Sequence, residues 1–218
     1  MAIQPMQLRI VDASQENAQF LAWVMLAASR AHNLEQSIWD FYVGGSEGEC
    51  LRWLTALATT SQPSWCHYSR FIVAEVDGRP AAALCGYFEK DHESLLAGTV
   101  EADRMVGRTE QDAAAGWQRA GSIAHCGADH VPGAWIVENV ATLPDYRRRG
   151  LVDRLLAEMI ARGRDQGATV CDIGVFIGNY PAQGAYEKAG FRVIGEKLHP
   201  EFEAAYKCPG IRFLRQSI

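Results

Sequence analysis

The sequence has no long apolar run and no excess of positive charge. Its most apolar early stretch, residues 20–28, is too short to cross a bilayer. The N-terminus lacks the basic residues and apolar core of a secretory leader. The formal net charge of −5 argues against a general nucleic-acid binder, although a local basic site remains possible. We therefore expect a cytoplasmic protein whose partners include neither membranes nor nucleic acids.

Paired cysteines and the common nucleotide-binding motifs are also missing. The six cysteines include no CxxC pair, so we expect buried reduced thiols and no metal site. Neither a dinucleotide-binding GxGxxG nor a P-loop GxxxxGK[ST] occurs. Repeats, low-complexity segments and linkers are absent as well, and 48% of the 218 residues are hydrophobic. These features predict a single α/β domain over residues 1–218.

The residues that are present alternate between strand and helix patterns. Asp77-Gly78 between two apolar runs predicts a hairpin turn. Most of residues 89–130 shows no regular pattern. The expected strands are 7–11, 70–76, 81–88, 134–142, 169–176, 191–196 and 211–214, and the expected helices are 15–30, 46–60, 108–120, 150–166 and 180–189.

One stretch, PDYRRRGLVDRLL over residues 144–156, places three arginines and a glycine between a predicted strand and a predicted helix. The first turn of a helix has N–H groups without internal partners, and the helix dipole makes that end positive. Gly150 would allow an anion to approach the main chain closely. The order of elements thus favours a phosphate site, while a solvated basic patch is the alternative.

The same stretch resembles the acetyl-CoA signature of the GNAT superfamily of N-acetyltransferases. Arg147 and Gly150 match its Arg/Gln-x-x-Gly-x-Gly/Ala pattern, whereas Val152 stands where glycine or alanine is usual. A second segment, NYPAQGAYEKAGF over residues 179–191, is similar to the family's Asn…Ala…Tyr-Glu-Lys-x-Gly-Phe segment. Together the two matches cover about residues 134–196.

This resemblance implies a mixed, mostly antiparallel sheet of six or seven strands, flanked by helices and splayed between strands 4 and 5. It also implies that acetyl-CoA is the cosubstrate and lies in that gap. The residues that would hold acetyl-CoA by the resemblance are Val140, Ala141 and Thr142 along the pantetheine arm, Arg147, Arg148, Arg149, Gly150, Leu151, Val152 and Asp153 around the pyrophosphate, and Asn179 at the next helix.

Catalysis by such an enzyme needs a base for the amine and an acid for the leaving thiolate. Tyr186 occupies the family's tyrosine position and is the candidate acid, with a core aromatic as the alternative. For the base we select Glu138, because strand alternation places Ile136, Glu138 and Val140 on one face and a carboxylate there needs a cleft or a partner. His125, His130 and His67 are weaker candidates.

The acceptor is expected to be a small-molecule amine or a peptide. Its pocket is predicted between the first two helices, residues 89–130 and the last hairpin, with the aromatic residues Trp39, Tyr42, Tyr87 and Trp117. A domain that binds acyl-CoA without catalysis is the main alternative, and RNA or DNA binding through the arginines is a third. A homodimer is possible on general grounds.

Overall fold

The computed structural model describes residues 7–33 and 36–218. The sequence analysis expects no secretory leader at the N-terminus. Residues 1–6 of that stretch lie outside the described residues. In the described ranges, no helix combines the length and the apolar character needed to span a membrane.

In this part of the chain, seven strands form one sheet in the order β1-β2-β3-β4-β5-β7-β6. Neighbouring strands run antiparallel except β4 and β5, which are parallel. The predicted mixed, mostly antiparallel sheet is therefore confirmed. The strands are β1 (Leu8–Asp12), β2 (Phe71–Val76), β3 (Arg79–Phe88), β4 (Trp135–Thr142), β5 (Val170–Phe176), β6 (Arg192–Leu198) and β7 (Gly210–Ser217).

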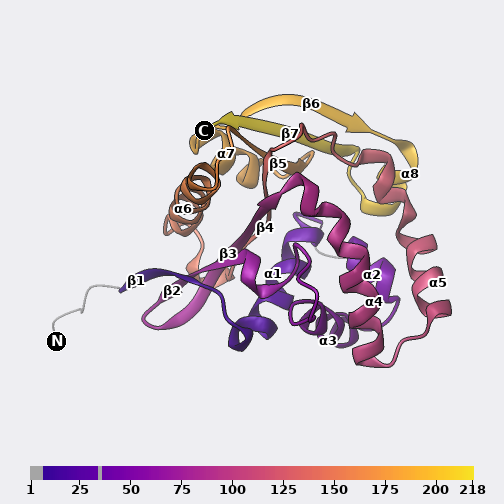
Figure 1. Ribbon diagram of the computed structural model, residues 1–218. Coiled ribbons are helices and arrows are strands. Elements are labelled where there is room, and N and C mark those ends of the chain that lie inside the picture. The colour runs from indigo at the N-terminus through magenta and orange to yellow at the C-terminus, as the bar shows by residue number, and fades with distance from the viewer. Residues whose placement is uncertain (1–6, 34–35) are drawn as a thin grey trace.

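Helices cover both faces of this sheet (Figure 1). On one face α1 and α3 enclose a core with Phe71 and Ile136, and on the other α6 and α7 enclose a core with Trp135 and Val137. Helices α4 and α5 pack outside α3 and α2. The helices are α1 (Ala18–Arg30), α2 (Ile38–Val43), α3 (Glu47–Leu57), α4 (Ser94–Val106), α5 (Glu110–Ala120), α6 (Leu151–Asp165), α7 (Tyr180–Lys188) and α8 (Pro200–Tyr206).

Three of these helices, α2, α4 and α8, were not predicted. Helices α2 and α8 have only 6 and 7 residues, too few to show an apolar period. Helix α4 contains Gly98 and Thr99, which have low helix propensity. A Cβ at position 98 would lie only 3.0 Å from Ser64 Cβ, so glycine allows α4 to approach closely the segment carrying Ser64. Packing therefore selects α4 where local preference is weak.

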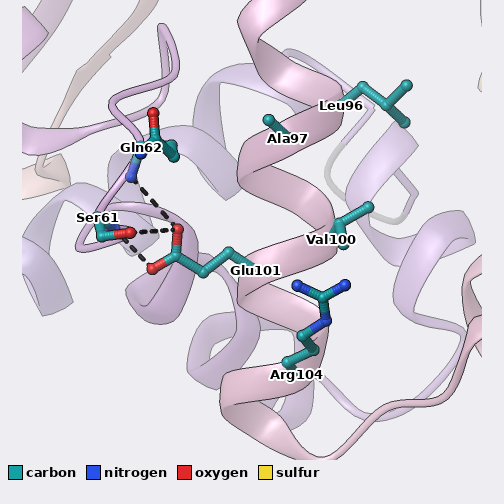
Figure 2. A pocket seen from close by; sticks show the side chains of 7 residues that line it. All are labelled: Ser61, Gln62, Leu96, Ala97, Val100, Glu101 and Arg104. Carbon is teal, nitrogen blue, oxygen red and sulfur yellow. Dashed lines mark hydrogen bonds between the residues drawn. The ribbon is translucent and has the colours of Figure 1, made fainter.

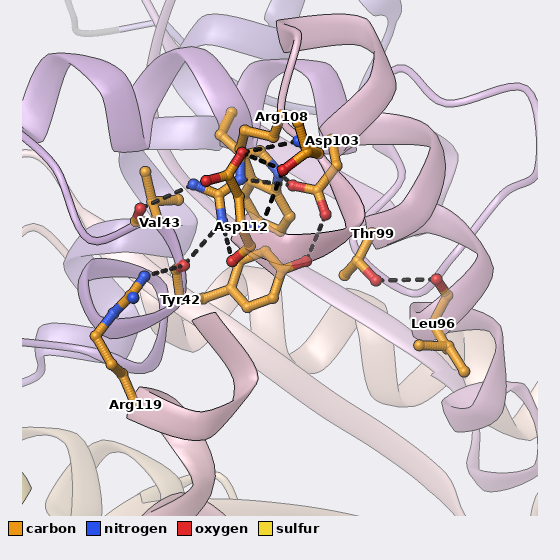
Figure 3. A network of polar contacts seen from close by, with 10 residues as sticks. Tyr42, Val43, Leu96, Thr99, Asp103, Arg108, Asp112 and Arg119 are labelled. Atoms are coloured by element: carbon orange, nitrogen blue, oxygen red, sulfur yellow. Dashed lines mark hydrogen bonds and ion pairs between the residues drawn. The ribbon is translucent and has the colours of Figure 1, made fainter. Parts of the chain in front are cut away.

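A buried carboxylate ties these outer helices to the domain (Figure 3). Asp103 of α4 is 4% exposed. It accepts hydrogen bonds from Tyr42 Oη at 2.5 Å and Trp53 Nε1 at 2.8 Å. Arg108 Nε donates to the same carboxylate at 2.7 Å, and its Nη1 donates to the carbonyl oxygen of Val43 at 2.8 Å. Since a buried charge is tolerated only with partners, this network fixes α4 relative to α2 and α3.

Candidate active site

The parallel strands β4 and β5 separate within the sheet. The last pair between them joins Val137 to Ile173, whereas β4 runs on to Thr142 and β5 to Phe176. Along residues 138–142, β4 keeps its pairing with β3. Among the described strands, none pairs with the other edge of this segment. The splay predicted between strands 4 and 5 is therefore present.

A β-bulge at Asn139 turns β4 at the start of the gap. Asn139 has a φ of 54°, in the left-handed region that asparagine tolerates, and its Nδ2 donates to Cys85 Sγ at 3.4 Å. The register with β3 shifts here. Because a bulge reverses the alternation of side chains, Val140 packs in the core beside α6, while Ile136 lies in the core beside α1. The prediction that Ile136, Glu138 and Val140 share one face is wrong for Val140.

The N-terminus of α6 follows the loop that leaves β4. Gly150 is its N-cap residue, with a φ of 73° that favours glycine. A Cβ at this position would have Asp153 Oδ2 as its nearest neighbour, at 3.9 Å, so the space beside the first turn is open. No side chain caps this helix, which leaves its first N–H groups for an external acceptor. These are the local features that an anion-binding site requires.

The three arginines of this loop are exposed at its surface. Arg148 has a left-handed φ of 59°. Arg147 Nε donates to the carbonyl oxygen of Thr142 at 3.4 Å, and the Arg149 guanidinium lies 5.3 Å from the centre of the Tyr146 ring. The loop thus carries its positive charge beside the α6 N-terminus.

Four more of the predicted cofactor residues use their side chains for packing, ion pairing or helix capping. Leu151 is buried and Val152 is partly buried in the core beneath α6. Asp153 forms an ion pair of 2.5 Å with Lys188 of α7. Asn179 caps α7 by accepting a main-chain N–H at 3.4 Å. Their roles toward acetyl-CoA stay predictions.

Glu138 is half-buried where β4 leaves β5. Its neighbour on β3, Cys85, belongs to the core beside α1. Burial raises the pKa of Glu138 from 4.5 to about 7, opposed by the Tyr87 hydroxyl and by the charge of His130. The buried Tyr87 hydroxyl approaches the carboxylate without reaching full hydrogen-bond geometry. A carboxylate that titrates near neutral pH is well matched to proton transfer.

Asp172 and Arg215, which form a polar cluster with the candidate base His130, were missed by the sequence analysis. Arg215 donates from Nε and Nη2 to Asp172 at 2.6 and 2.8 Å, and His130 Nδ1 lies 3.1 Å from Asp172 Oδ2. Burial by itself raises the pKa of Asp172, but Arg215 and His130 hold it below its ordinary value. The available signal was an aspartate inside an apolar strand, since a carboxylate there needs partners.

The other two histidines considered as bases are engaged elsewhere. His125 Nε2 lies 3.2 Å from Glu201 Oε2, and its ring stacks on His199 with centres 3.8 Å apart. His67 Nδ1 accepts the main-chain N–H of Ser69 at 3.2 Å.

Tyr186 lies on α7, in the core on the α6 side of the sheet. It is 6% exposed, and its ring centre is 6.5 Å from that of Phe191. Burial raises the pKa of the Tyr186 hydroxyl, so it remains protonated at neutral pH. The hydroxyl makes no hydrogen bond to the residues that the structure describes. A proton donor and a core aromatic would both look like this, so the acid role stays a prediction.

The aromatic residues predicted for the acceptor pocket lie in the core instead. Trp39, Tyr42 and Tyr87 are 2%, 1% and 0% exposed. Trp117 packs against Tyr42 with ring centres 4.7 Å apart. The pocket prediction is wrong for Trp39 and Tyr42, because α2, which carries both, was not predicted and its inward face was not recognised. Tyr87 of β3 is buried as well, with its hydroxyl close to Glu138.

A hollow of about 620 Å³ lies between α4 and the loop after α3, away from the gap between β4 and β5 (Figure 2). Its wall includes Leu96 and Val100, which are 63% and 39% exposed. The Glu101 carboxylate at its side accepts the main-chain N–H groups of Ser61 and Gln62 at 2.7 and 3.3 Å. The acidic group is thus used to hold the loop, and the hollow contains none of the predicted site residues.

The described residues contain no group of three histidine, cysteine, aspartate or glutamate side chains placed to hold a metal ion. All six cysteines are unpaired and buried. For Cys171, burial raises the pKa of the thiol, which disfavours a covalent acetyl-cysteine route.

Comparisons with known proteins agree with this geometry. A family model described as the acetyltransferase (GNAT) family matches residues 31–191. A crystal structure of an acetyltransferase has a TM-score of 0.72 and 17% identity, covering 96% of this chain and 99% of that chain. An N-acetyltransferase from Staphylococcus aureus Mu50 has a TM-score of 0.68 and 16% identity, covering 95% and 100%.

A third similar structure was solved with its cofactor acetyl-CoA. It is a putative acetyltransferase from Salmonella typhimurium, with a TM-score of 0.51 and 13% identity, covering 96% of this chain and 93% of that chain. At such identities the structural likeness shows the fold alone. None of the curated proteins matches this chain.

Proposed function

The chain belongs to the acetyltransferase (GNAT) family, and on this premise we propose that it transfers the acetyl group of acetyl-CoA to a primary amine. The observation that carries the proposal is the gap between β4 and β5. At one end of the gap lies Glu138, and the loop from the other end leads to the uncapped N-terminus of α6.

The residues around the gap fit an acyl-CoA ester. Main-chain groups of 140–142 face the opening and can pair with the amides of a pantetheine arm as an added strand would. The first N–H groups of α6, together with the exposed arginines 147–149, can bind a diphosphate. Acetyl-CoA supplies a thioester that is already activated toward nitrogen.

The protein's own contribution is positioning and proton transfer. Glu138 removes a proton from the acceptor ammonium, so that an N–H bond breaks and a carboxylic O–H bond forms. The neutral amine attacks directly, with both substrates held together in one complex. Tyr186 donates its hydroxyl proton to the departing sulfur, and the proton that the nitrogen loses as the amide forms returns to the Tyr186 phenolate. A pKa near 7 for Glu138 suits this task, because the carboxylate is available at neutral pH and still basic.

An amine panel tests the proposal. The protein is mixed with acetyl-CoA and with small amines, polyamines, aminoglycosides, amino acids or peptides with a free N-terminus. Released CoA is followed with a thiol reagent, and since all six cysteines are buried, the folded protein adds little background. We expect thiol release that depends on one amine class, with the acetylated amine identified by mass spectrometry. Tight CoA binding without transfer to any amine would instead indicate a non-catalytic acyl-CoA-binding domain.

Substitution of Gly150 tests the diphosphate site. Gly150→Glu places a carboxylate beside the first turn of α6, so we expect CoA affinity, measured by calorimetry, to fall by at least about tenfold from charge repulsion. Gly107→Glu is the matched control, because Gly107 has a similar φ of 80° and open space around it. Equal CoA affinity in the two folded variants would contradict the assignment of the α6 N-terminus.

A further inference from the structure

The end of α1 reaches across to the turn that follows β5. Helix α1 packs on β4 and ends at Arg30, and His32 follows shortly after it. His32 Nε2 lies only 3.0 Å from where a Cβ would be at Gly178, so the imidazole ring rests on the main chain of this turn. Gly178 also has a φ of 103°, which favours glycine. The ring thus stands on the α1 side of the gap, at its β5 edge.

Both neighbours of His32 hold it in this place. Ala31, the C-cap residue of α1, has a φ of 51° and a ψ of −125°, a conformation that residues with a side chain seldom adopt. Asn33 Nδ2 donates to the carbonyl oxygen of Tyr206 at the end of α8. Backbone strain of this kind persists only where the surrounding structure enforces it, and it gathers at active sites and ligand clamps. The strained residue therefore marks His32 as a candidate ligand contact.

The His32 side chain is exposed and its ring nitrogens are available to a ligand. The ring makes no hydrogen bond or ion pair with any residue that the structure describes. A neutral imidazole has one nitrogen that donates and one that accepts a hydrogen bond. Arg30 is neutralised by ion pairs with Asp40 and Glu47, so it adds no positive charge here for a phosphate. These groups suit a neutral polar part of a ligand, such as an amide or a hydroxyl.

The position of His32 along the gap matches the pantetheine part of the proposed cosubstrate site. Strands β4 and β5 are parallel, and their last pair joins Val137 to Ile173. Thr142 and Gly178 follow these two residues at equal separation along the chain, so they lie at about the same level on opposite sides of the gap. A pantetheine arm that pairs with the end of β4 would therefore pass the turn on which His32 rests.

We propose that His32 contacts the pantetheine arm of acetyl-CoA, with its imidazole hydrogen-bonded to an amide or to the hydroxyl of the arm. The inference rests on the proposed function, in which the arm lies between β4 and β5. His32 then covers the arm from the α1 side, while the α6 N-terminus binds the diphosphate from the other side. The contact makes and breaks no covalent bond, so His32 adds affinity for the cosubstrate and takes no part in proton transfer.

Calorimetry with CoA measures this contact without any acetyl transfer. His32→Ala should lower the affinity by about three- to tenfold, as the loss of one hydrogen bond predicts. His125→Ala is the matched control, because His125 is engaged with Glu201 of α8 and the variant should keep the wild-type affinity. Equal CoA affinity in folded His32→Ala and in the wild type overturns the inference.

The glycine beneath the ring provides a second test. In Gly178→Ala the new Cβ displaces the ring, so CoA affinity should fall, and the loss should be smaller when His32 is already alanine. Gly167→Ala is the control for backbone strain, because Gly167 has a φ of 92° and open space around it. A loss in Gly178→Ala that is the same with and without His32 assigns the effect to the backbone alone and overturns the inference.

NMR of the histidine rings separates the arm from the nucleotide. The His32 signal is identified by its absence in His32→Ala, and it should shift on addition of CoA and also of pantetheine, which has no diphosphate. In Gly150→Glu, pantetheine should still shift this signal although CoA affinity is reduced. A signal that saturating CoA leaves in place, or that CoA shifts and saturating pantetheine does not, overturns the assignment to the arm.

The inference and the proposed function can fail separately. A wild type that binds no CoA refutes the proposed function and this inference with it. A wild type that binds CoA and acetylates an amine, in which His32→Ala keeps the full CoA affinity, overturns the inference alone.

Discussion

Replacing Glu138 by glutamine connects the chemistry of the cleft with the stability of the fold. Burial raises the pKa of Glu138 from 4.5 to about 7, so between these values the folded chain keeps a proton that the unfolded chain has lost. The free energy of unfolding must therefore fall as the pH rises from 4.5 to about 7, and above pH 7 the whole of this decrease is present. Glutamine has the same shape and no charge, so the stability of Glu138→Gln does not decrease in this way as the pH rises.

The size of the effect follows from the difference in pKa. Each pH unit between 4.5 and about 7 corresponds to about 1.36 kcal/mol, which gives about 3 kcal/mol in total. Because the side chain is only half-buried, solvent reduces this to about 2–3 kcal/mol. For a chain of this length, that is a rise in Tm of about 4–12 °C at pH 8.

Thermal and urea unfolding of the wild type and of Glu138→Gln, at intervals from pH 4.5 to 8, measures this directly. The two stabilities should coincide at the acidic end and separate as the pH rises, with the variant more stable. Activity should move the other way: wild-type kcat/KM rises through about pH 7 as Glu138 loses its proton, and the variant loses about 100-fold or more.

Glu110→Gln is the matched control, because Glu110 is exposed on α5. Parallel stability curves for wild type and Glu138→Gln across this pH range would refute the reasoning. A Glu138→Gln variant that is more stable and fully active would also refute the reasoning, because Glu138 would then not act as the base.

Two further substitutions test the acid and the packing of α4. Tyr186→Phe should lower kcat by at least about tenfold with CoA affinity unchanged, as measured by steady-state kinetics and calorimetry, and equal losses in both would assign Tyr186 to the core alone. Asp103→Asn should cost about 3 kcal/mol in urea unfolding, because the partly buried charge of Arg108 loses its ion-pair partner. Asp112→Asn, an exposed aspartate nearby, should cost clearly less, and similar losses would contradict the role of the buried network.

The sequence by itself determined the elements whose signals are local. Asp77 and Gly78 have φ values of 50° and 76°, as the tight hairpin turn predicted from them requires. Gly150 at the start of α6 and Asn179 at the start of α7 act as the predicted helix boundaries. Each of these depends on the conformational preference of one or two residues, which is why the pattern along the chain was sufficient.

Tertiary structure decided which side chains meet at the cleft. The bulge at Asn139 turned Val140 to the other face, although alternation along the strand predicted otherwise. The cluster joins His130, in the loop before β4, to Asp172 of β5 and Arg215 of β7. These residues are 42 and 43 positions apart in the sequence and meet only in the folded sheet. A charged residue in an apolar strand indicates that the fold must supply it with partners. Whether it acts as a base or forms a structural ion pair depends on which distant residues the fold places beside it.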